Sequence, residues 1–405
     1  MTKEKLWTKT FISTSIVNFV LILSMYLLLV TMASYAMNTY GASTSLAGLV
    51  ASIFIIGVLF GRLFAGKQIE NIGTKKMLSI GISIFIILSF FYYFNLSIYF
   101  LIGIRIIQGI GVGLATTATG TIIAQVIPSS RNGEGIGYFS MSNVLATAIG
   151  PLVGVSLIST FDYVSIFIFS TTVSTVSLLL VLTIKEPKIP NTMEVNETTN
   201  KTAKFTLSSF FEKNALPISV TMLVVALAYS GILSFITTYA NEINLSKAGG
   251  YYFLVYALII LLSRPITGKL MDLKGANSVA YPAIVLFAIG MVIISQADSS
   301  FTFLLGAIFI GLGYGNFQSC TQAVAIKVTP LHRMGLANST YFIFLDFALG
   351  LGPLALGLLI PHIGFRGMYL LLSGIIMLSL FVYFILHGKK DKELLRLQQN
   401  NENIA

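Results

Sequence analysis

The feature that most constrains this chain is a series of twelve apolar runs, each about long enough to cross a lipid bilayer. A helix needs about 20 apolar residues to span ~30 Å of hydrocarbon. The chain is 55% hydrophobic and 10% charged, whereas soluble domains carry about 25% charged residues. We therefore predict an all-α integral membrane protein whose spans lie near residues 11–36, 46–65, 78–95, 98–124, 136–158, 162–184, 216–240, 248–270, 277–297, 301–326, 335–360 and 365–387.

The distribution of lysine and arginine predicts the orientation in the membrane. If both termini are cytoplasmic, 22 of the 25 basic residues lie on that side, two lie outside, and Arg105 is left within the bilayer. Such an excess marks the cytoplasmic side, so the net charge of +10 does not indicate a nucleic-acid partner. We expect a multi-pass protein of the cell membrane with an N-terminal six-helix bundle at 1–184, a cytoplasmic linker at 185–214, a C-terminal six-helix bundle at 215–388 and a cytoplasmic tail at 389–405.

The two halves repeat each other at a constant offset of 202 residues. Apolar residues would match by chance in two hydrophobic halves, whereas glycine, proline and charge together would not. Two parallel repeats of six spans are typical of a transporter that rocks about a site between its halves. The matched pairs include Arg62/Arg264, Gly66/Gly268, Glu70/Asp272, Gly73/Gly275, Gly109/Gly311, Pro128/Pro330, Arg131/Arg333, Gly150/Gly352 and Pro151/Pro353.

Three kinds of segment resemble motifs of the major facilitator superfamily. "GKQIENIG" and "GKLMDLKG" resemble its loops between spans 2 and 3 and between spans 8 and 9. "LIGIRIIQGIGVG" resembles its span-4 motif, and "GYFSMSNVLATAIGPLVG" resembles the span-5 motif associated with proton-driven exporters. The resemblance implies twelve helices in two pseudo-symmetric six-helix bundles, secondary active transport and no enzymatic activity. Asn71, Leu273 and Thr74 stand where the family usually has basic residues.

Each repeated loop carries the residues of a cytoplasmic gate. We expect about a dozen residues between the two helices, with glycine permitting the turn and the acid lying near the positive N-terminal end of a neighbouring helix. Charge contacts that form in one state and break in the other would make the loop a latch. Alternatively, the basic residues only fix the topology. The predicted gating residues are Arg62, Gly66, Lys67, Glu70, Gly73, Arg264, Gly268, Asp272 and Gly275.

Two charged residues lie deep within predicted spans, where charge is costly and usually functional. Asp346 is the only acid deep within a span, which makes it the candidate proton site or a charge site for a cationic substrate; alternatively it packs helices through hydrogen bonds. The resemblance implies that Arg105 helps to couple proton and substrate. The alternative is an arginine bound by carbonyl groups and Gln108. Nothing in the sequence shows whether the two residues meet.

The remaining candidates concern helix packing and the substrate cavity. Small residues and proline in spans 5 and 11 permit close approach of neighbouring helices; these residues are Gly150, Pro151, Gly154, Gly352 and Pro353. Polar and aromatic residues of spans 1, 4 and 7 are candidates to line the cavity, although helix contacts would also explain them: Asn18, Tyr26, Gln108, Tyr229 and Thr237. We expect no metal and no cofactor, because the chain has one cysteine, no metal-ligand cluster and no glycine–lysine nucleotide loop.

These features favour a monomeric secondary transporter that exports a small organic compound or drug in exchange for protons by alternating access. Proton-coupled uptake or facilitated passage of a metabolite, such as a sugar or organic acid, is the alternative. A transporter-like membrane sensor is a lesser one, because the linker and tail are too short for a sensory domain. Glu134 is predicted to be a solvated loop charge rather than a second proton site.

Overall fold

The computed structural model describes residues 5–94, 96–185 and 210–391, and all of their regular structure is helical. Eleven helical segments of these residues are long and apolar enough to cross a membrane. The helices, in order, are α1 (Lys9–Tyr40), α2 (Thr44–Ile72), α3 (Thr74–Phe90), η1 (Phe91–Tyr93), α4 (Ile98–Val126), η2 (Ser129–Arg131), α5 (Asn132–Thr160), α6 (Tyr163–Val181), α7 (Leu216–Glu242), α8 (Ser246–Lys274), α9 (Asn277–Ser295), α10 (Ser300–Ile310), η4 (Gly311–Gly315), α11 (Asn316–Lys327), η5 (Leu331–Arg333), α12 (Met334–Tyr383) and η6 (Phe384–Gly388).

The number of spans is twelve, because the longest segment contains two of them. Gly364, at φ 67° and ψ 175°, breaks α12 into the predicted eleventh and twelfth spans. The tenth span is formed by α10 and α11 joined through the π-helical turn η4. The prediction of an all-helical, twelve-span membrane fold is therefore confirmed. Most of the predicted linker, residues 186–209, and the tail from residue 392 lie outside the described residues.

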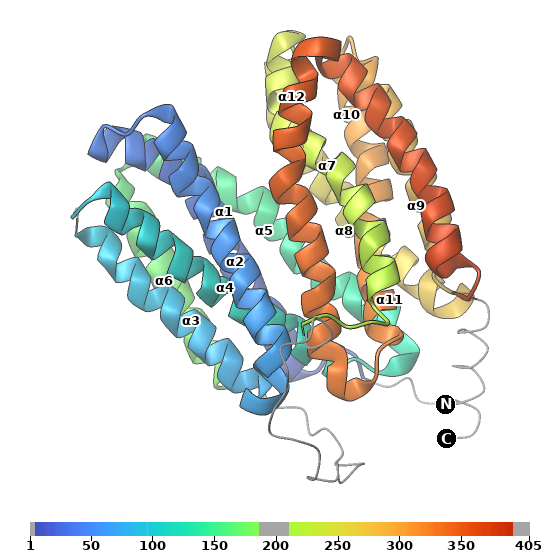
Figure 1. Ribbon diagram of the computed structural model, residues 1–405, viewed down its shortest axis with the longest axis horizontal. Helices are drawn as coiled ribbons and strands as arrows, with labels where there is room; N and C mark the ends of the chain where they lie inside the picture. Colours follow the sequence, from blue (N-terminus) through green and yellow to red (C-terminus); the bar gives the residue numbers. More distant parts are fainter. Residues whose placement is uncertain (1–4, 95, 186–209, 392–405) are drawn as a thin grey trace.

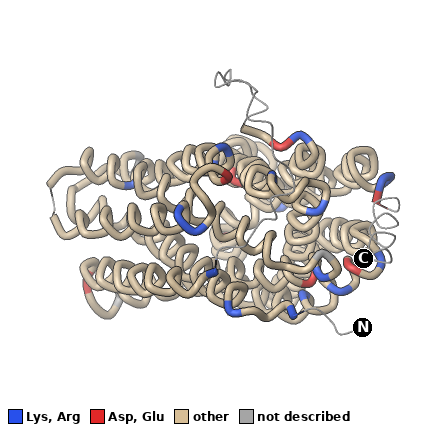
Figure 2. The backbone as a smooth tube through the Cα atoms, turned by 90° about the horizontal axis from the view of Figure 1, so that it is seen from below, with Lys and Arg blue, Asp and Glu red and all other residues tan. Residues whose placement is uncertain are grey.

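The first six spans and the last six form two groups of helices (Figure 1). In the view of Figure 1 the groups approach each other at the lower end and diverge toward the upper end. Helix α5 packs on α8, and α2 packs on α12, so these two pairs join the halves. Most lysine and arginine residues lie toward the right-hand side of Figure 2, and few charged residues lie at its left-hand end.

The hairpins that carry the repeated motif are much tighter than predicted. Helix α2 continues to Ile72 and α3 begins at Thr74, so Gly73 alone turns the chain, at φ 91° and ψ 145°. Its repeat mate Gly275 has φ 85° and ψ 170° at the end of α8. The expected loop of about a dozen residues is wrong, because the charged residues extend the helices beyond the apolar runs. Only glycine adopts these angles readily, which explains its place in both turns.

Glycine also brings α2 and α4 into close contact within the first half. A Cβ atom on Gly57 would lie 2.1 Å from the carbonyl oxygen of Ile106, and one on Gly113 would lie 2.3 Å from that of Val58. Backbone atoms cannot move aside as a flexible side chain can, so these positions exclude any larger residue. This packing fixes the helix that carries Arg62, the residue from which the candidate site is built.

Candidate functional site

A buried ion pair joins the two halves of the molecule. Arg62 of α2 and Asp346 of α12 lie 2.7 Å apart, Nε to Oδ2, with side chains that are 8% and 16% exposed. The Arg62 guanidinium also lies 4.7 Å from the centre of the Phe342 ring, and Ser339 donates a hydrogen bond to the Arg62 carbonyl. Ten residues separate Arg62 from the end of α2, which places the pair about 15 Å along the helix. The only acid deep in a predicted span is thus matched by a base from the other half.

This pair corrects the predicted position of Arg62. The sequence grouped Arg62 and Arg264 with the cations of the gating loops, but both lie inside helices and are 6% and 1% exposed. Without these two buried residues, the number of basic residues predicted on the cytoplasmic side falls from 22 to 20, against two outside. Sequence reasoning missed the partner of Asp346 because it ended the second span at residue 65, where the apolar run stops. The structure brings Asp346 to Arg62 and not to Arg105.

Arg105 is bound within the first half. Its Nη1 donates to Gln108 over 3.3 Å, its Nε donates to the Val50 carbonyl over 3.3 Å, and its guanidinium lies 4.4 Å from the Phe54 ring centre. This is the alternative arrangement that the sequence left open. Gln108 was expected to line the cavity, but it is fully buried and also accepts from Tyr92 and donates to Ser89.

The second gating acid caps a helix across the interface between the halves. The Asp272 carboxylate accepts hydrogen bonds from the backbone N–H groups of Gly133 (2.6 Å) and Glu134 (2.9 Å), at the N-terminus of α5. The unpaired N–H groups and partial positive charge of a helix N-terminus favour an anion there. Gly268 permits the approach, since a Cβ on it would lie 2.8 Å from the Glu134 Cα. The predicted position of the Asp272 carboxylate is therefore correct.

Glu70, the repeat mate of Asp272, is held differently. Its exposed side chain lies near His332 and Arg333 of η5, and no backbone N–H of a described residue donates to it. The equivalent interface is closed by other contacts, because Gly66 packs against Ser339 and Lys67 lies 4.7 Å from the ring centre of Phe210. The two repeated motifs are thus similar in sequence but make different interactions.

Glu134 is not the solvated loop charge that the sequence predicted. It is 8% exposed in the first turn of α5, and Arg131 donates to its Oε2 over 2.8 Å. This hydrogen bond raises the pKa of the Arg131 guanidinium, which therefore remains charged. Its backbone N–H holds Asp272, so Glu134 belongs to the interface between the halves.

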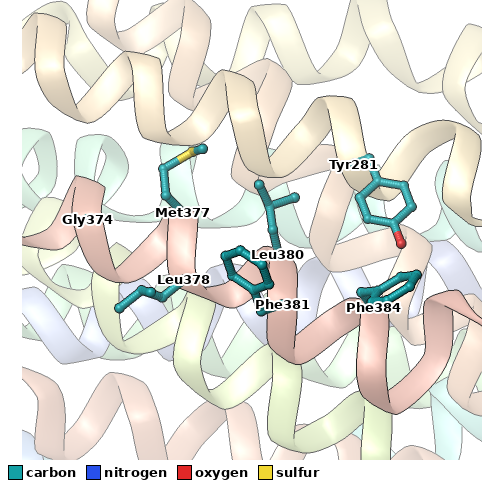
Figure 3. Close-up of a pocket in the computed structure, with 7 residues that line it drawn as sticks. All are labelled: Tyr281, Gly374, Met377, Leu378, Leu380, Phe381 and Phe384. Carbon is teal, nitrogen blue, oxygen red and sulfur yellow. The ribbon is translucent and has the colours of Figure 1, made fainter.

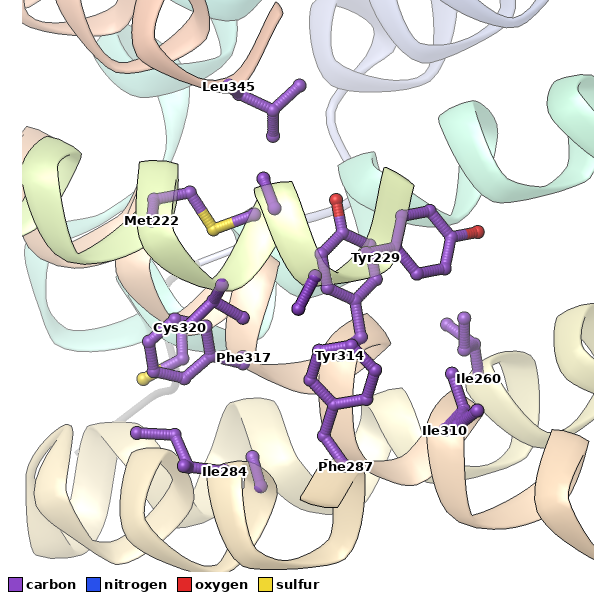
Figure 4. Packing of buried hydrophobic residues seen from close by; sticks show 14 of the residues in the cluster. Met222, Tyr229, Ile260, Ile284, Phe287, Ile310, Tyr314, Phe317, Cys320 and Leu345 are labelled. Carbon is purple, nitrogen blue, oxygen red and sulfur yellow. The ribbon is translucent and has the colours of Figure 1, made fainter. Parts of the chain in front are cut away.

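A cluster of tyrosines lies beside the Arg62–Asp346 pair. The rings of Tyr229 and Tyr314 stack with centroids 3.7 Å apart and an interplanar angle of 6°, as Figure 4 shows. Tyr256 also stacks on Tyr229, with ring centroids 5.8 Å apart and an interplanar angle of 25°. Tyr26, from the first half, is partly exposed and interacts electrostatically with both Asp346 and Arg62. Of the residues predicted to line the cavity, Tyr26 and Tyr229 therefore lie beside the Arg62–Asp346 pair.

The other two cavity candidates lie elsewhere. Asn18 is 2% exposed and is bound by Ser142, Asn143 and Thr119, so it joins α1, α4 and α5 within the first half. Thr237 is exposed, two turns beyond Tyr229 on α7. Neither residue is part of the tyrosine cluster.

The small residues of spans 5 and 11 pack helices within each half. A Cβ on Gly150 would lie 2.9 Å from the Leu23 carbonyl oxygen, and one on Gly154 would lie 3.0 Å from Thr31, so α5 packs tightly on α1. A Cβ on Gly352 would lie 2.1 Å from the Ser230 hydroxyl of α7. Pro151 and Pro353, each next to one of these glycines, lie inside α5 and α12. The two halves therefore use this motif in equivalent ways.

An apolar depression of about 450 Å³ lies on the outer surface of the second half (Figure 3). Tyr281 of α9 lines one end of the depression. Several side chains of α12 that line it are exposed, including Leu378 at 63% and Phe381 at 67%. Such side chains face hydrocarbon in a membrane-spanning protein. No group of metal-ligating side chains occurs among the described residues.

Comparison with known proteins identifies the family and the fold. The family model described as Major Facilitator Superfamily matches residues 14–346 and 250–403. The staphylopine export protein of Staphylococcus aureus is 24% identical, covering 85% of this chain and 88% of its own. The multidrug resistance protein MdtG of Dickeya zeae is 23% identical, covering 86% of each chain. The crystal structure of the human organic anion transporter MFSD10 has a TM-score of 0.75 at 14% identity, over 92% of this chain and 98% of its own.

Proposed function

Because the chain belongs to the major facilitator superfamily, whose members are transporters and not enzymes, we propose that this secondary transporter exports a small organic compound in exchange for protons. The observation that carries the proposal is the buried ion pair between Arg62 and Asp346, which joins the two halves. A carboxylate in that position can be charged only while the guanidinium stays close. Its protonation state and the arrangement of the halves are therefore linked.

The coupling step is the protonation of Asp346. Removing one partner of a buried ion pair leaves the other charge uncompensated, at a cost of about 3–5 kcal/mol. A proton on Asp346 has this effect on Arg62, so it favours a state in which α2 and α12 separate and water reaches the guanidinium. In that state the two halves separate at the end where α2 meets α3, and the substrate site becomes accessible from that side.

The orientation and direction are parts of the same proposal. We place both termini in the cytoplasm, on the excess of basic residues, so the state described here is closed toward the cytoplasm. One relative is named for the export of staphylopine and another for multidrug resistance, and these names favour export. Each proton that enters gains about 2.3 kcal/mol per 100 mV of membrane potential, which supplies the driving force. The protein works as a monomer with two gates, one at Asp272 and one at Glu70.

The test uses inverted membrane vesicles with an inward proton gradient reported by a pH-sensitive dye. A panel of lipophilic cations, fluoroquinolones, sugars and organic acids is added to vesicles that contain the wild type or Asp346→Asn. We expect a substrate to collapse the gradient in the wild type and not in the variant. An equal response from both would remove Asp346 from proton coupling. If no compound collapses the gradient, uptake or facilitated passage replaces export, and flux of labelled metabolites is measured next.

A further inference from the structure

The repeat mate of Arg62 is a buried arginine that has no acidic partner among the described residues. Arg264 of α8 is 1% exposed, and its Nη2 donates to the carbonyl oxygen of Gly315 over 2.8 Å. Its Nε and Nη1 are buried and make no hydrogen bond with any described residue. Ten residues separate Arg264 from the end of α8, so it lies at the same depth as Arg62 in α2.

The missing partner is explained by a break in the repeat. The mate of Asp346 at the offset of 202 is Val144 of α5, which is buried and apolar. The surrounding geometry is otherwise equivalent: Ser339 lies against the Arg62 carbonyl, and a Cβ on its mate Gly137 would lie 3.8 Å from the Arg264 carbonyl oxygen. Arg264 therefore lies against α5 as Arg62 lies against α12, but only one of the two interfaces contains a carboxylate.

The charges near the centre consequently do not balance. Within the described spans, the ionisable charges at this depth are Arg62, Arg264 and Asp346, which sum to one net positive charge. Buried donors without acceptors are costly, and the cost is largest when the donor is charged. A cationic ligand would raise this imbalance, whereas an anionic ligand would remove it. The Nε and Nη1 groups can each donate a charge-assisted hydrogen bond to an oxygen of a carboxylate or phosphate.

The surroundings of Arg264 fit the remainder of an organic ligand. Arg264 interacts electrostatically with Tyr256, which stacks on Tyr229, and Tyr229 stacks on Tyr314. Tyr314 belongs to the π-helical turn η4, whose last residue supplies the carbonyl that holds Arg264. Single π-helical turns within α-helices are frequent at functional sites. Planar apolar groups bind well to such aromatic faces.

We propose that the central site binds an organic anion, with its carboxylate or phosphate accepting from the unpartnered N–H groups of Arg264 and its planar part against the tyrosines. This inference rests on the proposed transport function and defines the class of its substrate. It replaces the expectation of a cationic substrate at Asp346, because Asp346 is already neutralised by Arg62. The two interfaces then have separate tasks, since one carries the proton and the other carries the substrate.

The experiment measures binding without a proton gradient, so that its failure is distinct from a failure of coupling. Purified protein is melted in the presence of four probes that share one ring: benzoate, phenyl phosphate, benzyl alcohol and benzyltrimethylammonium. A ligand that binds only the folded state raises the Tm. We expect benzoate or phenyl phosphate to raise the Tm, and the neutral and cationic probes to leave it unchanged. Which of the two anions has the larger effect distinguishes a carboxylate site from a phosphate site.

The variants separate a binding role for Arg264 from a structural one. Arg264→Gln is expected to weaken anion binding by about tenfold to a hundredfold, since a hydrogen bond to a charged group is worth ~1.5–3 kcal/mol. Arg264→Lys should keep the preference for anions over cations. Lys269→Gln removes one exposed positive charge from the same helix and should bind as the wild type does.

Val144→Asp gives a test that does not depend on the stability of the Arg264 variants. It restores the carboxylate that the repeat lacks, so it should raise the Tm of the ligand-free protein and abolish the shift caused by anions. The proposal is overturned if the cationic probe stabilises the wild type as much as the anions do. It is also overturned if no anion raises the Tm, or if Val144→Asp binds the anions unchanged.

Discussion

The contact between Asp272 and the start of α5 predicts how strongly one gate holds the two halves together. The carboxylate accepts two short backbone hydrogen bonds, from Gly133 and Glu134, and both cross from one half to the other. Asp272→Asn removes the charge but keeps one oxygen that can accept a single hydrogen bond. The new amide NH₂ group is a donor, so it cannot accept the second backbone hydrogen bond.

The expected effect follows from the hydrogen bond and the charge that are lost. A hydrogen bond to a charged group contributes about 1.5–3 kcal/mol, and a charge at a helix terminus adds ~0.3–1 kcal/mol. Loss of one such bond and of the charge, about 1.8–4 kcal/mol together, shifts the ratio of closed to open molecules by roughly 20-fold to 800-fold. Because the interaction exists only while α5 and α8 are in contact, the whole change appears in this ratio.

Spin labels at Lys76 and Lys274 would report the separation of the halves. Both positions are exposed. Lys76 lies near the start of α3 in the first half, and Lys274 is the last residue of α8 in the second half. Pulsed electron–electron distance measurements should show one short distance in the wild type and a large population of longer distances in Asp272→Asn. Glu70→Gln is the matched control, because Glu70 accepts no backbone hydrogen bond from a described residue, and it should change the distribution little. Equal distributions for wild type and Asp272→Asn would refute the reasoning.

Three further predictions concern stability in detergent, measured by thermal unfolding. Gly66→Ala should cost about 1–3 kcal/mol because its Cβ would lie 2.8 Å from the Ser339 Cβ, and Ser339→Gly in the same chain should recover most of the loss. Gly73→Ala should cost about 1–3 kcal/mol at φ 91°, whereas Gly41→Asn, at φ 62° and ψ 28°, should be nearly neutral. Burial would raise the pKa of Asp391, but the neighbouring His387 side chain, 3.7 Å away, and hydrogen bonds from two backbone N–H groups of the turn into α9 lower it overall. Its stabilisation is then present above the unfolded pKa of about 3.9 and lost as pH falls through the lower folded pKa, so Asp391→Asn should lower the Tm at neutral pH and lose less on acidification than the wild type.

The sequence was sufficient for the fold because its signals are local. Apolar runs identify spans, and glycine, proline and charge at a fixed offset identify the repeat. The site was harder to predict, because it depends on where the helices end and how they pack. Hydropathy ended the second span at residue 65, yet α2 continues to Ile72 since charged residues are good helix formers and long basic side chains reach the membrane interface. That difference of two turns moved Arg62 from the end of a predicted span, where it was grouped with the gating residues, to the interior of α2, where it pairs with Asp346.

Residues whose roles depend on which side chains pack against them could not be assigned from the sequence. Gln108 has the composition of a cavity residue, but its three partners lie within its own half. Asp272 was predicted correctly because a motif with an acid at the end of one span points to the start of a neighbouring helix, whichever helix that is. General electrostatics therefore located Asp272, whereas pair-specific packing decided the fate of Glu70, Arg62 and Arg264.

The function proposed here lies where the repeat is broken. Positions that match at the offset of 202, such as Gly73/Gly275 and Gly150/Gly352, perform the same structural task in both halves. Positions that do not match carry the uneven charge: Asp346 has Val144 as its mate. A fully symmetric chain would hold either two neutral ion pairs or two unpaired arginines at its centre. The first arrangement would have no free group for an anion, and the second would have no site for a proton. One Asp in place of one Val provides both, so the two variants Asp346→Asn and Val144→Asp should each abolish a different half of the transport cycle.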